Sequence, residues 1–321
     1  MQPDPVAGGN RPSLDGAAIL ARAPGVARLA EVEAIDWGLV PASHLRFEQI
    51  LDLARVIQAQ LDRGDVDGVV LVQGTDTIEE SSFAFDLLLK SDKPVVVTGA
   101  MRDAASAEYD GPRNLVDAVG CAASSSLRGF GVVVVLAGLV VAAEQVVKGH
   151  STALDAFRSR DGHLLGEVSD GVVRLSRGRE PRDPRHSRAR LGSVPQLAVE
   201  DVHLVTVVTG MDGALIRGLA PTRPRGLVVA ATGSGNTHPD VLAAARELME
   251  AGTIVCLTTR CPTGTIDPIY AFPGGGVTWQ RAGALMSAHD GPKSRVALAL
   301  GLAAGMDRDA LVALISPDSL Q

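Results

Sequence analysis

The pattern of apolar and polar residues alternates between two forms along the chain. In FEQILDLARVIQAQL (47–61), apolar side chains recur at every third or fourth position with polar side chains between them, which is typical of an amphipathic helix. The segments VVLV (69–72) and PVVVTGA (94–100) are instead short, rich in β-branched residues and without polar alternation. Such segments are expected of parallel strands that are covered on both faces. The alternation of the two forms predicts an α/β fold.

The same alternation extends over the whole chain. Further helices are predicted near 14–22, 79–89, 113–125, 212–219, 239–250 and 292–304, the last of which would close the chain, and further strands near 131–138, 202–208, 226–232 and 253–259. Between about 176 and 200, arginine, proline and glycine replace the apolar periodicity, as in a segment between domains. We expect a larger N-terminal domain with a doubly wound, mostly parallel sheet (1–178), an Arg- and Pro-rich linker (179–200) and a smaller C-terminal α/β domain (201–321).

The charge of the chain narrows the range of partners. Its 321 residues carry a formal net charge of −7, which argues against a general binder of nucleic acid or acidic membranes, because such proteins need a positive surface. One local exception is a basic segment that contains Arg174, Arg177, Arg179, Arg182, Arg185, Arg188 and Arg190. No aromatic residues lie between these arginines to stack on bases, so we interpret the segment as a solvated linker. We expect no nucleic-acid partner and no membrane partner.

The cysteines and histidines give no sign of a metal or a disulfide framework. Cys121, Cys256 and Cys261 are too few and too scattered for such a framework, and the seven histidines form no group with metal-ligand spacing. The glycine-rich GSGN (233–236) and GGG (274–276) lack the spacing of phosphate or dinucleotide loops. No segment resembles a signal peptide or an apolar membrane span. We expect a cytoplasmic protein that uses neither metal nor cofactor.

The polar stretch QGTDTIEE (73–80) directly follows the predicted strand VVLV. Loops at the carboxyl ends of parallel strands form the ligand crevice of open α/β sheets. Here Gly74 permits close approach of a ligand, Thr75 supplies a hydroxyl and Asp76 supplies an acceptor, whereas Glu79 and Glu80 suit the first turn of the next helix. The alternative is a capping box, in which Thr or Asp caps the helix with a glutamate three residues later. These residues alone leave both interpretations open.

Several further motifs accompany this stretch in a fixed order. The chain resembles the bacterial L-asparaginase family from about residue 13 to its C-terminus, in QGTDTIEE (73–80), PVVVTGAMR (94–102), DGPRNLVDA (110–118), AAEQVVKGHSTALDAF (142–157), ATGSGN (231–236) and GPKSRVALALGLA (291–303). The resemblance implies an amidohydrolase without cofactor that converts asparagine, glutamine or a related amide to the acid and ammonia. It also implies a homo-oligomer, a dimer or a tetramer, whose sites are completed across a subunit interface.

The resemblance assigns roles residue by residue. Thr75, Asp76 and Lys148 match the family's catalytic group of threonine, aspartate and lysine. A lysine beside a threonine hydroxyl and a carboxylate is suited to proton transfer. The residues implied to bind the substrate are Ser43, Gly74, Asp76, Ala100 and Asn236. Ser43 would bind the α-carboxylate of the amino acid, or would cap the following helix, and Asp76 would bind its α-ammonium.

The chain also departs from the family pattern. Family members have a Thr-Gly-Gly-Thr type loop after their first strand, with the threonine nucleophile, and a nearby tyrosine; here no threonine precedes Thr75 and no tyrosine precedes Tyr109. Gln73 stands where the family usually has histidine. Either the chain lacks its true N-terminus or the lineage has lost the nucleophile. We therefore expect impaired hydrolysis relative to a version extended upstream, and keep as an alternative a catalytically silent homologue that binds amino acids.

Overall fold

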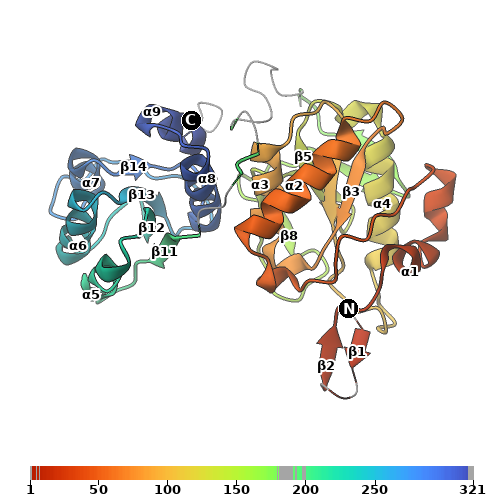
Figure 1. Ribbon diagram of the computed structural model, residues 1–321, viewed down its shortest axis with the longest axis horizontal. Coiled ribbons are helices and arrows are strands. Elements are labelled where there is room, and N and C mark those ends of the chain that lie inside the picture. The colour runs from red at the N-terminus through yellow and green to blue at the C-terminus, as the bar shows by residue number, and fades with distance from the viewer. Residues whose placement is uncertain are drawn as a thin grey trace. The chain divides into compact units, whose positions relative to one another are not determined.

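The computed structural model describes residues 2–4, 6, 8–178, 180, 191, 194–196 and 200–316. The chain divides into two compact units, Met1–Val194 and Pro195–Gln321, which are coloured red to green and green to blue in Figure 1. Most of the predicted linker 179–200 lies outside the described residues, and so do Arg179, Arg182, Arg185, Arg188 and Arg190. The exact domain limits therefore stay a prediction.

The N-terminal unit contains a six-stranded sheet in the order β10-β9-β6-β5-β4-β3. Its strands are β3 (Val69–Val72), β4 (Val95–Thr98), β5 (Val132–Leu136), β6 (Leu139–Ala142), β9 (Gly166–Ser169) and β10 (Val172–Leu175). The pairs β3–β4 and β4–β5 are parallel, and the pairs β5–β6, β6–β9 and β9–β10 are antiparallel. The two-domain α/β architecture is confirmed, but the sheet is mixed rather than mostly parallel.

Two tight turns explain the antiparallel pairs β5–β6 and β9–β10. Ala137 and Gly138 have φ values of 52° and 79°, and Asp170 and Gly171 have φ values of 52° and 78°. Two consecutive residues with positive φ form the turns that join neighbouring antiparallel strands. The predicted strand 131–138 is therefore a strand and a turn, and β6 follows it directly.

Helices cover both faces of the N-terminal sheet, as its apolar strands require. Helices α2 (Phe47–Leu61) and α3 (Ile78–Leu88) lie on one face, and α4 (Gly111–Ala123) lies on the other (Figure 1). Every residue of β4 and β5 is buried. The short helix α1 (Gly16–Ala21) and the following turn pack near α4, where Val26 contacts a cluster with Leu115 and Val119. The strands β1 (Gln2–Asp4) and β2 (Gly9–Arg11) form a separate antiparallel hairpin.

A second hairpin of the N-terminal unit bears directly on function. Strands β7 (Val146–Lys148) and β8 (Phe157–Ser159) form their own antiparallel two-stranded sheet, with Lys148 opposite Phe157. The sequence pattern does not predict these three-residue strands, because each is too short for an apolar period to appear. The hairpin carries Lys148 beside α3.

The C-terminal unit is a four-stranded parallel sheet in the order β11-β12-β13-β14. Its strands are β11 (Val202–Thr206), β12 (Gly226–Ala231), β13 (Ile254–Thr259) and β14 (Leu285–Met286), and its helices are α5 (Ala214–Arg217), α6 (Pro239–Glu250), α7 (Gly276–Ala282), α8 (Gly291–Ala303) and α9 (Arg308–Ile315). The prediction that the helix near 292–304 closes the chain is wrong, because α9 follows it. Leu311 and Leu314 of α9 are buried, so this helix packs into the C-terminal unit.

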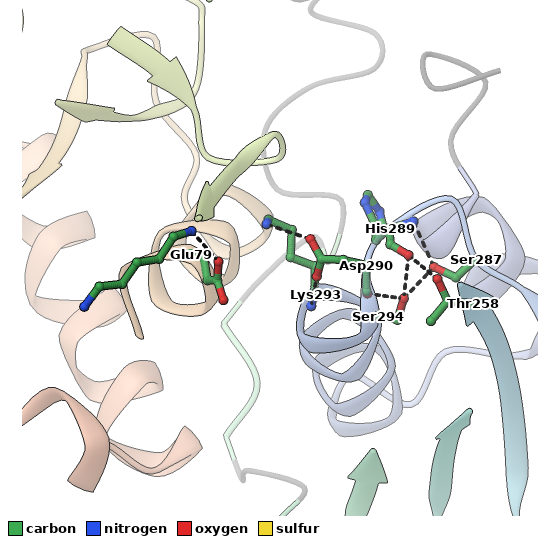
Figure 2. Close-up of polar contacts among 8 residues, drawn as sticks. Glu79, Thr258, Ser287, His289, Asp290, Lys293 and Ser294 are labelled. Atoms are coloured by element: carbon green, nitrogen blue, oxygen red, sulfur yellow. Dashed lines mark hydrogen bonds and ion pairs between the residues drawn. The ribbon is translucent and has the colours of Figure 1, made fainter. Parts of the chain in front are cut away.

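A buried polar network secures the start of α8 (Figure 2). Asp290 caps the helix by accepting from the Lys293 amide at 2.9 Å, and its other oxygen pairs with the Lys293 ammonium at 3.0 Å. Ser294 donates to Ser287 at 2.8 Å. Lys293 is only 1% exposed, so the aspartate supplies the counter-charge that a buried ammonium requires. The network is a structural feature of the C-terminal unit.

Candidate functional site

The polar stretch 73–80 lies at the carboxyl end of β3, where the sequence places it. After β3 ends at Val72, the chain enters a 3₁₀ turn, η3 (Thr75–Thr77), which leads directly into α3. Thr77 is the N-cap residue of α3, but its side chain makes no capping hydrogen bond; its hydroxyl donates to the Ala42 carbonyl at 3.1 Å. The capping-box interpretation is therefore wrong for Thr77, and the polar side chains of Thr75 and Asp76 are not used to cap the helix.

Three of the predicted site residues are in direct contact. The Lys148 Nζ atom lies 2.9 Å from Thr75 Oγ1 and 2.9 Å from Asp76 Oδ1. The Lys148 side chain is only 14% exposed, whereas that of Asp76 is 68% exposed. The ammonium is thus largely withdrawn from solvent and held by one hydroxyl and one carboxylate, while Asp76 keeps acceptor capacity toward solvent. The catalytic role of this group stays a prediction.

Glu79 adds a contact that the sequence does not reveal. It lies in the first turn of α3 (Figure 2), where its Oε2 accepts from the backbone N–H of Lys148 at 2.8 Å. The sequence assigns Glu79 only to the positive end of the helix. It lies four residues after Thr75, which is in the 3₁₀ turn η3 that precedes the helix. Only the tertiary structure shows that both groups hold the same lysine.

The loop after β4, which carries Ala100, lies directly against the loop after β3. A Cβ at Gly99 would lie only 2.5 Å from the Gln73 carbonyl oxygen, so the two loops touch through backbone. Asp110 accepts from the amides of Met101 and Arg102 at 3.0 and 2.9 Å. Asn114 donates to the Gly99 carbonyl at 3.0 Å. These side chains fix the loop on both sides of Ala100, whose part in substrate binding stays a prediction.

Ser43 lies on a 3₁₀ turn, η2 (Ala42–His44), that contacts the same region. The residue that faces Gly74 is Ala42, whose Cβ would lie 3.1 Å from a Cβ at Gly74. Ser43 itself is exposed. It does not cap α2, because that helix has Arg46 as its N-cap residue. The capping alternative for Ser43 is therefore wrong, and its substrate contact stays a prediction.

Asn236 belongs to the C-terminal unit, in the loop after β12. Its carbonyl accepts from the Thr232 amide at 3.0 Å, and the two residues form an isolated β-bridge. Its side-chain Oδ1 is buried and has no hydrogen-bond partner among the described residues. The loop turns at Gly233 and Gly235, which have φ values of 52° and 109°. A role of Asn236 in the site of a neighbouring subunit stays a prediction.

Within the described parts of the chain, no group of three or more His, Cys, Asp or Glu side chains is arranged to hold a metal ion. In the same residues, no helix has the length and hydropathy of a membrane span.

The chain thus has two α/β units, and a hydroxyl, a carboxylate and an ammonium are in contact at the end of a parallel strand of the first unit, where α/β enzymes place their sites. Comparison with known families identifies the family to which the chain belongs. The family model described as "Asparaginase, N-terminal" matches residues 1–181, and that described as "Glutaminase/Asparaginase C-terminal domain" matches residues 201–315. The chain belongs to the asparaginase family of amidohydrolases.

Individual relatives extend this similarity over nearly the whole chain. A "Probable L-asparaginase" of Deinococcus radiodurans is 33% identical over 308 residues, which are 94% of this chain and 91% of that protein. A "Glutaminase-asparaginase" of Acinetobacter glutaminasificans is 28% identical over 89% of this chain and 85% of its own length. The crystal structure of a probable cytoplasmic L-asparaginase from Campylobacter jejuni has a TM-score of 0.81 and 28% identity, and covers 94% of each chain.

Proposed function

We propose that the protein hydrolyses the side-chain amide of L-asparagine to aspartate and ammonia, with glutamine or a related amide as a further substrate. The contact of the Lys148 ammonium with Thr75 Oγ1 and Asp76 Oδ1 supports this proposal most directly. The names of the relatives, L-asparaginase and glutaminase-asparaginase, point to the same substrates.

The net reaction breaks the amide C–N bond and adds water. A hydroxyl oxygen bonds to the carbonyl carbon, and the leaving nitrogen gains a proton and departs as ammonia. In the proposed site, Thr75 orients the attacking water; Lys148, in its neutral amine form, takes a proton from this water and passes it to the leaving nitrogen, which restores the amine. Asp76 holds the lysine through one oxygen and binds the substrate's α-ammonium through its remaining acceptor capacity. Ser43, Gly74 and Ala100 complete the substrate pocket.

The proposal is tested by measuring ammonia release from asparagine and glutamine, together with calorimetric binding of aspartate, on the same preparations. We expect turnover by the wild-type chain, and in Thr75→Val a loss of about 10²-fold or more in kcat with retained aspartate binding. Unchanged turnover in Thr75→Val would exclude the role of Thr75. Aspartate binding without any turnover by the wild type would favour a silent amino-acid-binding homologue instead.

We further propose that the protein is a homo-oligomer, a dimer or a tetramer, in which Asn236 of one subunit serves the site of the next. This proposal rests on the resemblance to the family, in which the residue matched by Asn236 serves the site of a neighbouring subunit. Light scattering at micromolar concentration tests the oligomeric state, and a monomer would contradict it.

For the location of the protein we propose the cytoplasm. Cys121, Cys256 and Cys261 are all free, and burial raises the pKa of the Cys121 and Cys256 thiols to about 12. The solved relative from Campylobacter jejuni is named as a probable cytoplasmic enzyme. Fractionation of the source cells, with activity followed in each fraction, tests this assignment.

A further inference from the structure

Lys148, whose position is critical to the proposed site, lies on an isolated two-stranded hairpin. Lys148 ends β7, which pairs only with β8 in a separate two-stranded sheet. An isolated hairpin of two strands is marginally stable at best in water. The position of Lys148 relative to Thr75 therefore depends on contacts between the hairpin and the rest of the N-terminal unit.

The backbone of Lys148 makes such a contact on the outer edge of the hairpin. Its N–H donates to Glu79 Oε2 at 2.8 Å, whereas the next amide, that of Gly149, donates across the hairpin to the Ala156 carbonyl at 2.8 Å. The Lys148 amide thus points away from β8, and the carboxylate of Glu79 occupies the edge where another strand would otherwise pair. A hydrogen bond from a backbone amide to a carboxylate is among the stronger kinds in proteins.

The anchor itself is rigid and belongs to the segment that forms the site. Thr75, Asp76 and Glu79 lie within five consecutive residues at the junction of η3 and α3. The helix is fixed by its core, because Ile78, Phe83 and Leu87 are all fully buried. One short segment therefore holds Lys148 at both ends: Glu79 binds its backbone, and Thr75 and Asp76 bind its ammonium.

We propose that Glu79 is a positioning residue for the proposed amide hydrolysis, which keeps Lys148 Nζ within hydrogen-bonding distance of Thr75 and Asp76. The inference rests on the function proposed above. Val146 and Phe157 keep the hairpin packed in the core, but without this anchor the outer edge of β7 loses its hydrogen bond to α3 at Lys148, and the ammonium can shift with it. A displacement of about 1 Å in a reacting group can lower a rate by about 10²-fold.

Variants of the two adjacent glutamates separate this role from a general effect on the helix. Glu79→Ala removes the acceptor, Glu79→Gln keeps an acceptor oxygen, and Glu79→Asp keeps the charge but shortens the side chain. Glu80→Ala is the matched control, because Glu80 lies in the same first turn of α3 and is also half-buried. Both glutamates interact with the positive end of the helix.

We expect Glu79→Ala and Glu79→Asp to lower kcat by about 10- to 100-fold, with KM changed by less than about threefold. Glu79→Gln and Glu80→Ala should stay within about threefold of the wild-type kcat. Should Glu79→Ala fail to fold, Glu79→Asp gives the same comparison. Two outcomes would overturn the proposal. One is an equal kcat in Glu79→Asp, Glu79→Gln and Glu80→Ala. The other is an equal loss of kcat in Glu79→Gln and Glu79→Asp.

Amide hydrogen exchange at Lys148 gives a second readout that does not depend on activity. Exchange should be faster in Glu79→Ala and Glu79→Asp than in the wild type, and unchanged in Glu80→Ala, because only Glu79 protects this amide. Unchanged exchange in both Glu79 variants would overturn the anchoring contact. A wild-type chain that releases no ammonia, yet shows this exchange pattern, would refute the proposed function and leave the anchoring contact standing.

Discussion

Lys148 is the residue on which the proposed chemistry depends most. Replacement by methionine keeps the length of the side chain but removes the ammonium that contacts Thr75 and Asp76. We expect Lys148→Met to lower kcat for asparagine by about 10²- to 10⁴-fold, the usual contribution of a general acid or base. Lys90→Met is the control, because Lys90 is exposed at the end of α3. Equal rates of ammonia release in the two variants would contradict the role of Lys148.

Asp117 makes the stability of the N-terminal unit depend on pH. It is fully buried on α4, and burial raises the pKa of its carboxyl above the ordinary value, despite a 3.0 Å hydrogen bond from the Gly171 amide and Arg113 at 3.9 Å. The folded protein therefore binds this proton more tightly than the unfolded chain does. Stability is lost as the pH rises from the unfolded-state pKa, about 3.9, through the raised folded-state pKa.

Asp117→Asn removes this titration. We expect its free energy of unfolding, relative to the wild type, to increase as the pH rises from about 4 through the raised folded-state pKa, and to level off below about pH 4 and again above that pKa. Urea denaturation across this pH range measures the difference. A relative stability that increases toward acid would show that the carboxylate is stabilised by folding, against the direction argued here.

At the scale of elements, two glycines set how closely segments of the N-terminal unit approach. A Cβ at Gly99 would press on the Gln73 carbonyl, next to Gly74 and Thr75, and a Cβ at Gly120 would press on the Gly171 carbonyl, in the turn between β9 and β10. Both sites contact backbone, which cannot move aside as a flexible side chain can. They therefore form a matched pair, one beside the proposed site and one within the structural core.

We expect Gly99→Ala and Gly120→Ala each to lower the free energy of unfolding by about 1–3 kcal/mol, the cost of overpacking. Only Gly99→Ala should also lower kcat, by about tenfold or more, because it displaces the segment that carries Thr75. Urea denaturation and ammonia release on both variants measure these effects. Equal losses of kcat in the two would mean that the β3 and β4 loops are no more important to activity than the rest of the fold.

At the scale of the whole molecule, the proposed oligomer makes a quantitative prediction. If each site combines Lys148 of one subunit with Asn236 of another, Lys148→Met and Asn236→Ala are each defective, but a hybrid of the two retains one intact site. Random mixing of equal amounts makes about half of the dimers hybrids. Each hybrid has one intact site out of two, so about a quarter of the wild-type activity should return.

Refolding the two variants together and measuring ammonia release tests this complementation. The controls are each variant refolded alone, and Lys148→Met refolded with Thr75→Val, which both alter the same N-terminal group and so should restore nothing. The mixture of Lys148→Met and Asn236→Ala could instead show only the mean activity of the two variants refolded alone. That result would contradict a site shared between subunits.

The sequence by itself determined the α/β architecture, most of its longer elements and the strand end that carries Thr75 and Asp76. Apolar runs without polar alternation predict covered strands, and β4, β5, β12 and β13 are almost entirely buried, as expected. The expectation is wrong for β3, which lies at the edge of the sheet and is only partly buried, with Val72 exposed. The order of the motifs also determined the family. The apolar pattern and each motif are properties of consecutive residues, so the sequence shows them directly.

The resemblance to the family grouped Thr75, Asp76 and Lys148, but only the tertiary structure decided how distant groups meet. Antiparallel β6 depends on two residues with positive φ, one of them alanine, for which the sequence gives only a weak signal. Lys148 reaches Thr75 and Asp76 on a hairpin too short to show a period, and Glu79 meets its backbone only because that hairpin packs beside α3. Contacts between residues about seventy positions apart arise from packing, which no pattern of neighbouring residues encodes.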